Sequence, residues 1–215
     1  MYKNKLIEKK KNESKFIKKT LNNDEENNLI ESNISVIDNH IFFYSAVNTS
    51  SILELNKHIL SLNQTLIKNK LEIDHHYNTN LNLRIYLHIN SLGGYIFDAL
   101  AAVDTIKNSK IPITSIIEGC AASAASLISI VANERKMTKN SSILIHQLSG
   151  GTWGTFEQIK DENKNNIYLD KIMKDLYIFH TNGKLKEQKL KKVLKRDILW
   201  NPKKCKKFGL IDEII

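Results

Sequence analysis

The 215-residue sequence is poor in cysteine and has no long apolar run. Its two cysteines, Cys120 and Cys205, offer no metal-binding spacing and no disulfide framework, so a reducing, intracellular setting is expected. The apolar, uncharged stretch Gly119–Ala132 spans fourteen residues, which is too short to cross a bilayer and indicates a buried core element. The N-terminus lacks the apolar segment of a secretory signal. These absences argue against a secreted or membrane-spanning protein.

Arginine is also scarce, because only three of the 32 basic residues are arginine. The net charge of +9 is concentrated at the N-terminus, where residues 1–20 hold eight lysines and two glutamates, leaving +3 for the remainder (9 − 6). Phosphate recognition favours arginine forks, so nucleic acid is not an expected partner. We expect residues 1–39 to be a basic, polar, disordered extension, with organellar targeting or a propeptide as alternatives, and residues 40–215 to be the domain.

The domain alternates strand-like and helix-like segments. Strands are expected at 40–47, 84–89, 113–119 and 142–148, and helices at 50–71, 96–109, 120–132, 155–180 and 185–194. A polar loop carrying His75 and His76 is expected after the first helix. No third metal ligand lies at a suitable spacing from this pair, so a solvated loop is expected there instead of a metal site. Strands interleaved with helices predict an α/β fold of βαβ units around a largely parallel sheet.

Chemistry-bearing residues follow the ends of these strands, where sites form in such folds. The pair Gly93–Gly94 follows strand 84–89, Ser123 follows strand 113–119, and His146 lies near the end of strand 142–148. The glycine pair lacks the third glycine of a dinucleotide motif and the Lys-Ser/Thr of a P-loop, and its functional interpretation is a close backbone approach to an oxyanion or a phosphate.

Each of these residues taken alone has an ordinary structural explanation. The glycines are typical of a turn, and the stretch GCAASAASLISIVA is typical of a closely packed helix. His146 is typical of a core histidine whose ring nitrogens are hydrogen-bonded within the protein. Asp197 fits a cap or a surface ion pair. Ser126 and Ser129 lie further into the helix and are expected to bond to its backbone or to pack. Together, however, Ser123, His146 and Asp197 supply a nucleophile, a base and an orienting acid, a set that recurs on unrelated folds.

Four segments resemble the proteolytic subunit of the Clp protease, the ClpP family, from about residue 41 to residue 215. These are YLHINSLGG, EGCAASAAS, SSILIHQLSGG and KRDILWNPKKCKKFGLIDEI, in the family's order and at family-like spacing. The resemblance implies a crotonase-like fold with a protruding handle at about 150–180. Two departures are Leu92, where the family usually has proline, and Ala124, which replaces a bulkier side chain. The small-residue pattern looks most like ClpP-like proteins of large phages and other viruses.

The resemblance implies a serine endopeptidase that cleaves unfolded proteins. Ser123 would be the nucleophile, His146 the base and Asp197 the orienting acid, while the backbone N–H groups of Gly94 and Ala124 would form the oxyanion hole. The substrate would bind as an extended strand to residues that follow the strands at 84–89 and 142–148. The residues expected to contact it are Gly93, Tyr95, Ile96, Gln147 and Leu148. No metal is expected.

The resemblance also implies an assembly. Two stacked heptameric rings of identical subunits would enclose the sites, and an AAA+ unfoldase of the Clp type would feed them and consume ATP, so this chain would need no cofactor. The cytoplasm, or the host cytoplasm for a viral protein, is the expected location. Six apolar handle positions are expected to be buried, namely Trp153, Phe156, Ile159, Ile172, Leu176 and Phe179.

Three other functions are open alternatives. A catalytically silent ring subunit would typically lack a triad member, whereas all three are present here. A crotonase-type acyl-CoA enzyme on the same fold relies on an oxyanion hole and needs no Ser–His–Asp set, so CoA binding would distinguish it. A nucleic-acid-binding protein would depend on the lysine tail, and deletion of residues 1–28 would abolish its function.

Overall fold

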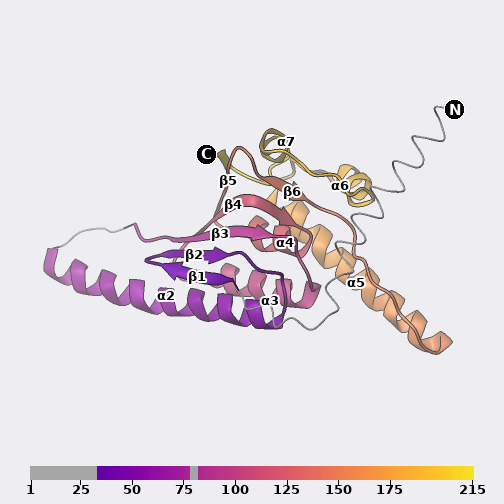
Figure 1. Ribbon diagram of the computed structural model, residues 1–215, viewed down its shortest axis with the longest axis horizontal. Helices are drawn as coiled ribbons and strands as arrows, with labels where there is room; N and C mark the ends of the chain where they lie inside the picture. Colours follow the sequence, from indigo (N-terminus) through magenta and orange to yellow (C-terminus); the bar gives the residue numbers. More distant parts are fainter. Residues whose placement is uncertain (1–32, 78–81) are drawn as a thin grey trace. The chain divides into compact units, whose positions relative to one another are not determined.

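The computed structural model describes residues 33–77 and 82–215, apart from the side chains of residues 74–77. Its centre is a seven-stranded sheet in the order β1-β2-β3-β4-β5-β7, with β6 paired to β4 (Figure 1). The strands are β1 (Ile34–Ile37), β2 (His40–Phe43), β3 (Ile85–Ser91), β4 (Ile113–Ala122), β5 (Glu134–Met137), β6 (Ser142–Leu144) and β7 (Glu213–Ile214). Among the described strands only β1 and β2 pair antiparallel, so the predicted α/β fold with a largely parallel sheet is confirmed.

The described part of the chain also contains six helices, which pack around the sheet. They are α2 (Thr49–Tyr77), α3 (Ile96–Lys107), α4 (Ala124–Ile130), α5 (Phe156–His180), α6 (Glu187–Leu194) and α7 (Pro202–Lys207). The alternate residues Ile85, Leu87 and Ile89 of β3 face the core and are fully buried. Small residues of α3, including Ala99 and Ala102, are also fully buried and let the helix approach the sheet closely.

The structure corrects several predicted element bounds. Strand β4 continues to Ala122, so the helix expected from residue 120 begins only at Ala124. Strand β6 ends at Leu144, which leaves His146 in the following loop instead of inside a strand. Helix α2 extends to Tyr77, so the residues expected to form a polar loop, His75 and His76, belong to its last turn.

Three short strands, β1, β5 and β7, lie outside the four ranges expected for strands. Strand β5 was missed because only four residues, ERKM, carry it. Strand β1 lies within the range 1–39 that was expected to be an extension, whereas residues 1–32 of that range lie outside the described residues.

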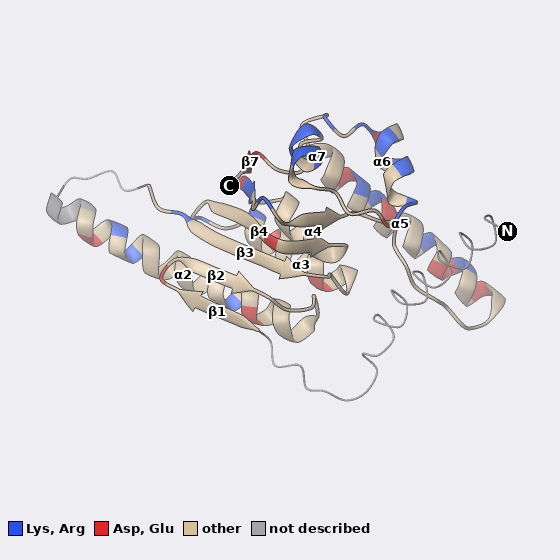
Figure 2. Ribbon diagram, turned by 45° about the horizontal axis from the view of Figure 1, so that its top comes forward, with Lys and Arg blue, Asp and Glu red and all other residues tan. Residues whose placement is uncertain are grey.

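Helix α5 corresponds to the expected handle helix and carries charges of both signs, while lysines gather on α6 and α7 (Figure 2). None of the six handle positions expected to be buried is fully buried in the single chain, so their burial in an assembly stays a prediction. Trp153 is fully exposed just before the helix, and Phe156 and Phe179 are also exposed. The buried positions of the helix are Leu169, Met173 and Tyr177. In the described part of the chain, no helix is long and apolar enough to cross a membrane.

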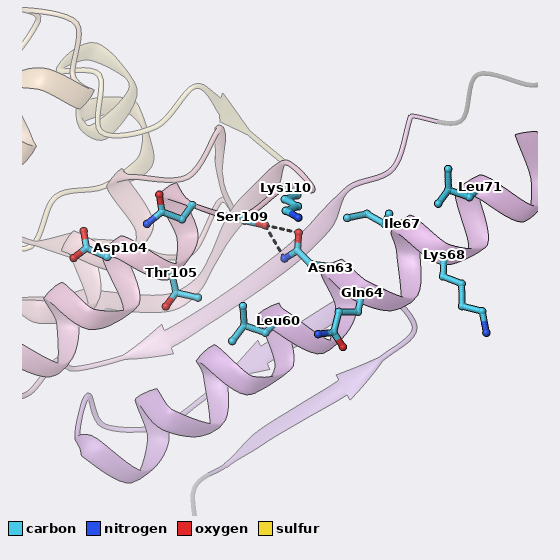
Figure 3. Close-up of a pocket in the computed structure, with 11 residues that line it drawn as sticks. Leu60, Asn63, Gln64, Ile67, Lys68, Leu71, Asp104, Thr105, Ser109 and Lys110 are labelled. Atoms are coloured by element: carbon cyan, nitrogen blue, oxygen red, sulfur yellow. Dashed lines mark hydrogen bonds between the residues drawn. The ribbon is translucent and has the colours of Figure 1, made fainter.

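A groove of about 680 Å³ lies between α2 and the C-terminal end of α3 (Figure 3). Asn63 of α2 lines this groove. Its Nδ2 donates to Ser109 Oγ at 2.9 Å, and its Oδ1 accepts the Ile111 N–H at 2.8 Å. These bonds fix α2 to the segment between α3 and β4. None of the predicted site residues lines this groove.

Candidate active site

Three parallel strands bring the predicted site residues to one edge of the sheet. Ser91 of β3 pairs with Ala121 of β4, so two residues further on Gly93 lies beside Ser123. Ala122 of β4 pairs with Leu144 of β6, and the ladder continues past the strand because the Ser123 N–H donates to the Leu144 carbonyl at 2.8 Å. His146 follows Leu144 by two residues. The register of β3, β4 and β6 therefore gathers the glycine pair, the serine and the histidine.

Ser123 lies between β4 and α4 in an unusual backbone conformation. Its φ of 53° and ψ of −124° fall outside the regions that a serine readily adopts. Such a conformation costs about 1–3 kcal/mol and persists only where the surrounding structure holds it. Here the Ser123 N–H is bonded to Leu144, and the Ser123 carbonyl accepts the Ser126 N–H at 3.0 Å. The sharp turn sets Ser123 apart from both the strand and the helix.

A second register places Asp197 beside His146. Ile143 and Trp200 exchange two backbone hydrogen bonds in an antiparallel bridge, of 3.0 and 2.7 Å. Three residues onward from Ile143 and three residues back from Trp200, His146 faces Asp197. The distance between His146 Nδ1 and Asp197 Oδ1 is 3.5 Å. This geometry leaves His146 Nε2 for another partner.

The three side chains are not joined in a continuous hydrogen-bonded chain. Among the described residues no hydrogen bond links Ser123 Oγ to His146, and the His146–Asp197 distance exceeds that of a hydrogen bond. The side chain of Asp197 is 78 % exposed, and that of His146 is 23 % exposed. Catalytic hydrogen bonds are often long in a free enzyme and tighten when substrate binds.

The glycine pair permits two close backbone approaches that a side chain would prevent, one to Ser123 and one to Val47. Gly93 has a φ of +97°, and a Cβ built on it would lie 2.8 Å from Ser123 Cβ and 2.6 Å from the Ala122 carbonyl oxygen. A Cβ on Gly94 would lie 2.0 Å from the Val47 carbonyl oxygen. In the described structure the Gly94 N–H donates to no other group. Ala124 is the first residue of α4, so its N–H has no partner within the helix.

These groups surround a cavity of about 160 Å³. Its lining includes Ser123, His146, Gly94 and Ala124, together with the predicted substrate-contacting residues Tyr95, Ile96, Gln147 and Leu148. The predicted residue Gly93 does not line the cavity, but its backbone lies directly against Ser123 and the Ala122 carbonyl. The predicted residue Asp197 does not line it either and reaches it through His146.

Two of the predicted substrate-contacting residues use their backbone N–H groups within the chain. The Tyr95 N–H donates to the Val47 carbonyl at 2.9 Å, and the Gln147 N–H donates to the Leu194 carbonyl at 2.8 Å. These two N–H groups are therefore occupied within the chain, and substrate binding by Tyr95 and Gln147 stays a prediction for their other groups. Because N–H groups alternate along an extended segment, that of Leu148 faces away from Leu194.

The other nucleophile candidates of the stretch have structural roles, as predicted for the serines. Ser126 Oγ donates to the Ser123 carbonyl, and Ser129 Oγ lies 3.3 Å from Ser115 Oγ. Burial raises the pKa of the Cys120 thiol, which disfavours the reactive thiolate.

The cavity wall also contains a residue that the sequence analysis missed, Tyr177 of α5. It is 1 % exposed, and its Oη lies 2.6 Å from Ser126 Oγ. The sequence gives no local signal for it, because its proximity to α4 depends on helix packing. In the described part of the chain, no group of three or more His, Cys, Asp or Glu side chains is arranged to hold a metal ion.

Comparisons with known proteins agree with this geometry. The profile of the Clp protease family matches residues 36–215. The ATP-dependent Clp protease proteolytic subunit of Deinococcus radiodurans is 33 % identical over 133 residues, which are 61 % of this chain and 64 % of that protein, so the match spans less than two thirds of the relative's length. An Asn-to-Asp mutant of ClpP1 from Listeria monocytogenes shares the fold, with a TM-score of 0.69 and 23 % identity over 83 % of this chain and 91 % of that one. The fold is thus the crotonase-like fold of ClpP, and the chain belongs to the Clp protease family.

Proposed function

We propose that this protein is a serine endopeptidase in which Ser123, His146 and Asp197 act together. The observation that carries the proposal is the convergence of Ser123, His146 and the N–H groups of Gly94 and Ala124 on one small cavity. Ser123 Oγ attacks the scissile carbonyl while His146 Nε2 takes its proton and later delivers it to the leaving amine. Asp197, next to His146 Nδ1, holds the tautomer that leaves Nε2 free to accept that proton.

The developing oxyanion would be stabilised by two backbone donors. The N–H groups of Gly94 and Ala124 have no partner among the described residues, and they come from two segments next to Ser123, the β3–α3 loop and the start of α4. Loss of one such donor typically lowers kcat by about 10²–10³-fold. Leu92 replaces the usual proline but precedes both glycines, so it leaves the donors in place.

The substrate would be an extended, unfolded polypeptide. Ile96, at the start of α3, and Leu148, in the loop after β6, both line the cavity, and their backbone groups would bond to the substrate. The apolar side chains of Leu127 and Met173 line the same cavity and would receive an apolar residue next to the scissile bond.

Assembly into two stacked heptameric rings of identical subunits is also proposed. Trp153, Phe156 and Ile159 stand exposed at the start of α5, where burial against a second ring would remove apolar surface from water. An AAA+ unfoldase of the Clp type would deliver substrate and consume the ATP, and the peptidase itself would use no cofactor. We place the protein in the cytoplasm, or in a host cytoplasm if it is viral, and we include β1 in the domain because it belongs to the sheet.

The test is labelling of the purified protein with a fluorophosphonate, which reacts with activated serines. Intact mass should show one adduct on the wild type and on Ser129→Ala, whose serine is bonded to Ser115, and none on Ser123→Ala. The size of the assembly should be measured on the same samples. Absence of an adduct on a folded, ring-sized assembly would refute the peptidase and favour the silent ring subunit.

A further inference from the structure

Two buried hydroxyl groups connect α5 to the backbone of Ser123. Tyr177 Oη lies 2.6 Å from Ser126 Oγ, and Ser126 Oγ lies 2.6 Å from the Ser123 carbonyl oxygen. Ser126 is 2 % exposed and Tyr177 is 1 % exposed, so water does not compete for these bonds. A serine hydroxyl has one proton, and Ser126 donates it to the carbonyl of Ser123. Tyr177 must therefore be the donor to Ser126.

The carbonyl at the end of this path belongs to the same peptide group as an oxyanion donor. The Ser123 carbonyl and the Ala124 N–H are the two polar groups of one planar trans peptide and point in opposite directions. Any rotation of that plane moves both groups together. A bond that holds the Ser123 carbonyl in the protein interior therefore aims the Ala124 N–H into the cavity.

The plane needs such support because its neighbourhood is strained. Ser123 has a positive φ, and α4 is only seven residues long, so the helix provides few bonds of its own near this peptide. The Ser123 carbonyl accepts two bonds, both from Ser126, namely the N–H at 3.0 Å and the Oγ at 2.6 Å. The shorter bond is the one that Tyr177 supports. Burial raises the pKa of Tyr177, which keeps its hydroxyl protonated and able to donate.

We propose that Tyr177 is a positioning residue that acts through Ser126 to fix the peptide plane between Ser123 and Ala124, and so aligns the oxyanion hole. The inference rests on the proposed peptidase function and adds to it a dependence on α5. Because Tyr177 is part of α5, a displacement of this helix would reach the oxyanion hole through two hydrogen bonds.

The experiment is a double-mutant cycle on the full-length protein, with kcat and KM measured on a fluorogenic peptide and the rate of fluorophosphonate labelling measured in parallel. Tyr177→Phe keeps the ring in the cavity wall and removes only the hydroxyl. We expect about a ten-fold fall in kcat and in the labelling rate, because a misaligned donor loses part of its full 10²–10³-fold effect. KM should change less than about two-fold, since the ring that faces substrate is kept.

The cycle also includes Ser126→Ala and the double variant. If Tyr177 acts through Ser126, the double variant should be no slower than Ser126→Ala, whereas independent effects would multiply. Tyr168→Phe, on the exposed side of the same helix, is the matched control and should keep the wild-type rate. Rates are taken well below the Tm of every variant, so that the loss of folded protein does not contribute.

Three results would overturn the inference. They are a Tyr177→Phe variant with wild-type kcat, a change confined to KM, and multiplied effects in the double variant. In each case an active, labelled wild type would leave the peptidase proposal standing. A wild type that neither cleaves peptide nor reacts with the probe would refute the proposed function, and this inference with it.

Discussion

A methyl group on Gly93 would enter space that the backbone around Ser123 already fills. Its Cβ would lie 2.6 Å from the Ala122 carbonyl oxygen, 2.8 Å from Ser123 Cβ and 3.1 Å from the Ala124 nitrogen. Ordinary contact begins at 3.4 Å, so the worst overlap is about 0.8 Å (3.4 − 2.6). All three atoms lie on or next to the backbone and cannot rotate away. The loop after β3 must therefore move away from Ser123.

The displacement should affect catalysis more than stability. The overlap and the φ of +97° together should lower the free energy of unfolding by about 2–4 kcal/mol. A shift of nearly 1 Å in the adjacent Gly94 N–H takes it out of hydrogen-bond range of the oxyanion, which should lower kcat by about 10²-fold. We therefore expect Gly93→Ala to fold with a reduced Tm and to be nearly inactive on a fluorogenic peptide.

Gly183→Ala separates the two effects. Gly183 has a φ of +74°, but nothing lies within 4 Å of its Cβ position. This variant should lose about 1 kcal/mol from backbone strain and keep the wild-type kcat. A Gly93→Ala variant with wild-type kcat at a temperature where it is fully folded would refute the assignment of the β3–α3 loop to the oxyanion hole.

Three further predictions concern Asp197, His180 and Arg135. Asp197→Asn should lower kcat by about 10²–10⁴-fold without changing Tm, because its exposed side chain orients His146 and packs against little; an unchanged kcat would remove it from the triad. Burial, with Lys107 and Arg135 nearby, lowers the pKa of His180 below its usual 6.5 in the folded chain. As the pH falls from 6.5 to the folded pKa, His180 therefore binds a proton in the unfolded chain but not in the folded one, which favours unfolding. The Tm should therefore fall between pH 7.5 and 5.5, and less so in His180→Gln; equal falls would contradict this assignment. Arg135→Met should reduce the free energy of unfolding in urea by about 2–4 kcal/mol, because the Asp212 carboxylate and the His180 and Gly209 carbonyls lose the buried guanidinium that donates to them. A loss under about 1 kcal/mol would show that water takes the place of the guanidinium as donor.

The sequence predicted those parts of the fold that have long hydrophobic periodicities. Helix α5 was expected at 155–180 and occupies Phe156–His180, because its pattern continues over many turns. The boundary between β4 and α4 was misplaced because the run of small residues Cys120–Ala122 suits a helix by propensity, yet in the structure it pairs with β6. Tertiary pairing decided the conformation there, and it is this pairing that puts Ser123 at the turn.

The candidate site could be predicted in its residue types but not in its internal distances. Ser123, His146 and the glycine pair followed from their places at strand ends, and they do line or support one cavity. The hydrogen bonds of the Tyr95 and Gln147 N–H groups could not be predicted from sequence, since their acceptors, the Val47 and Leu194 carbonyls, lie far away in the chain. Long-range partners of this kind leave no local pattern.

The bridge between Ile143 and Trp200 also sets the order in which the site can form during synthesis. Ser123 and His146 leave the ribosome before the segment that carries Asp197, and that segment takes its place only when Trp200 pairs with Ile143. A nascent chain therefore holds a serine and a histidine but no acid beside them. The C-terminal segment is thus the last part of the candidate site to be made, and a chain truncated before it would lack both Asp197 and the buried Trp200 that pairs with Ile143.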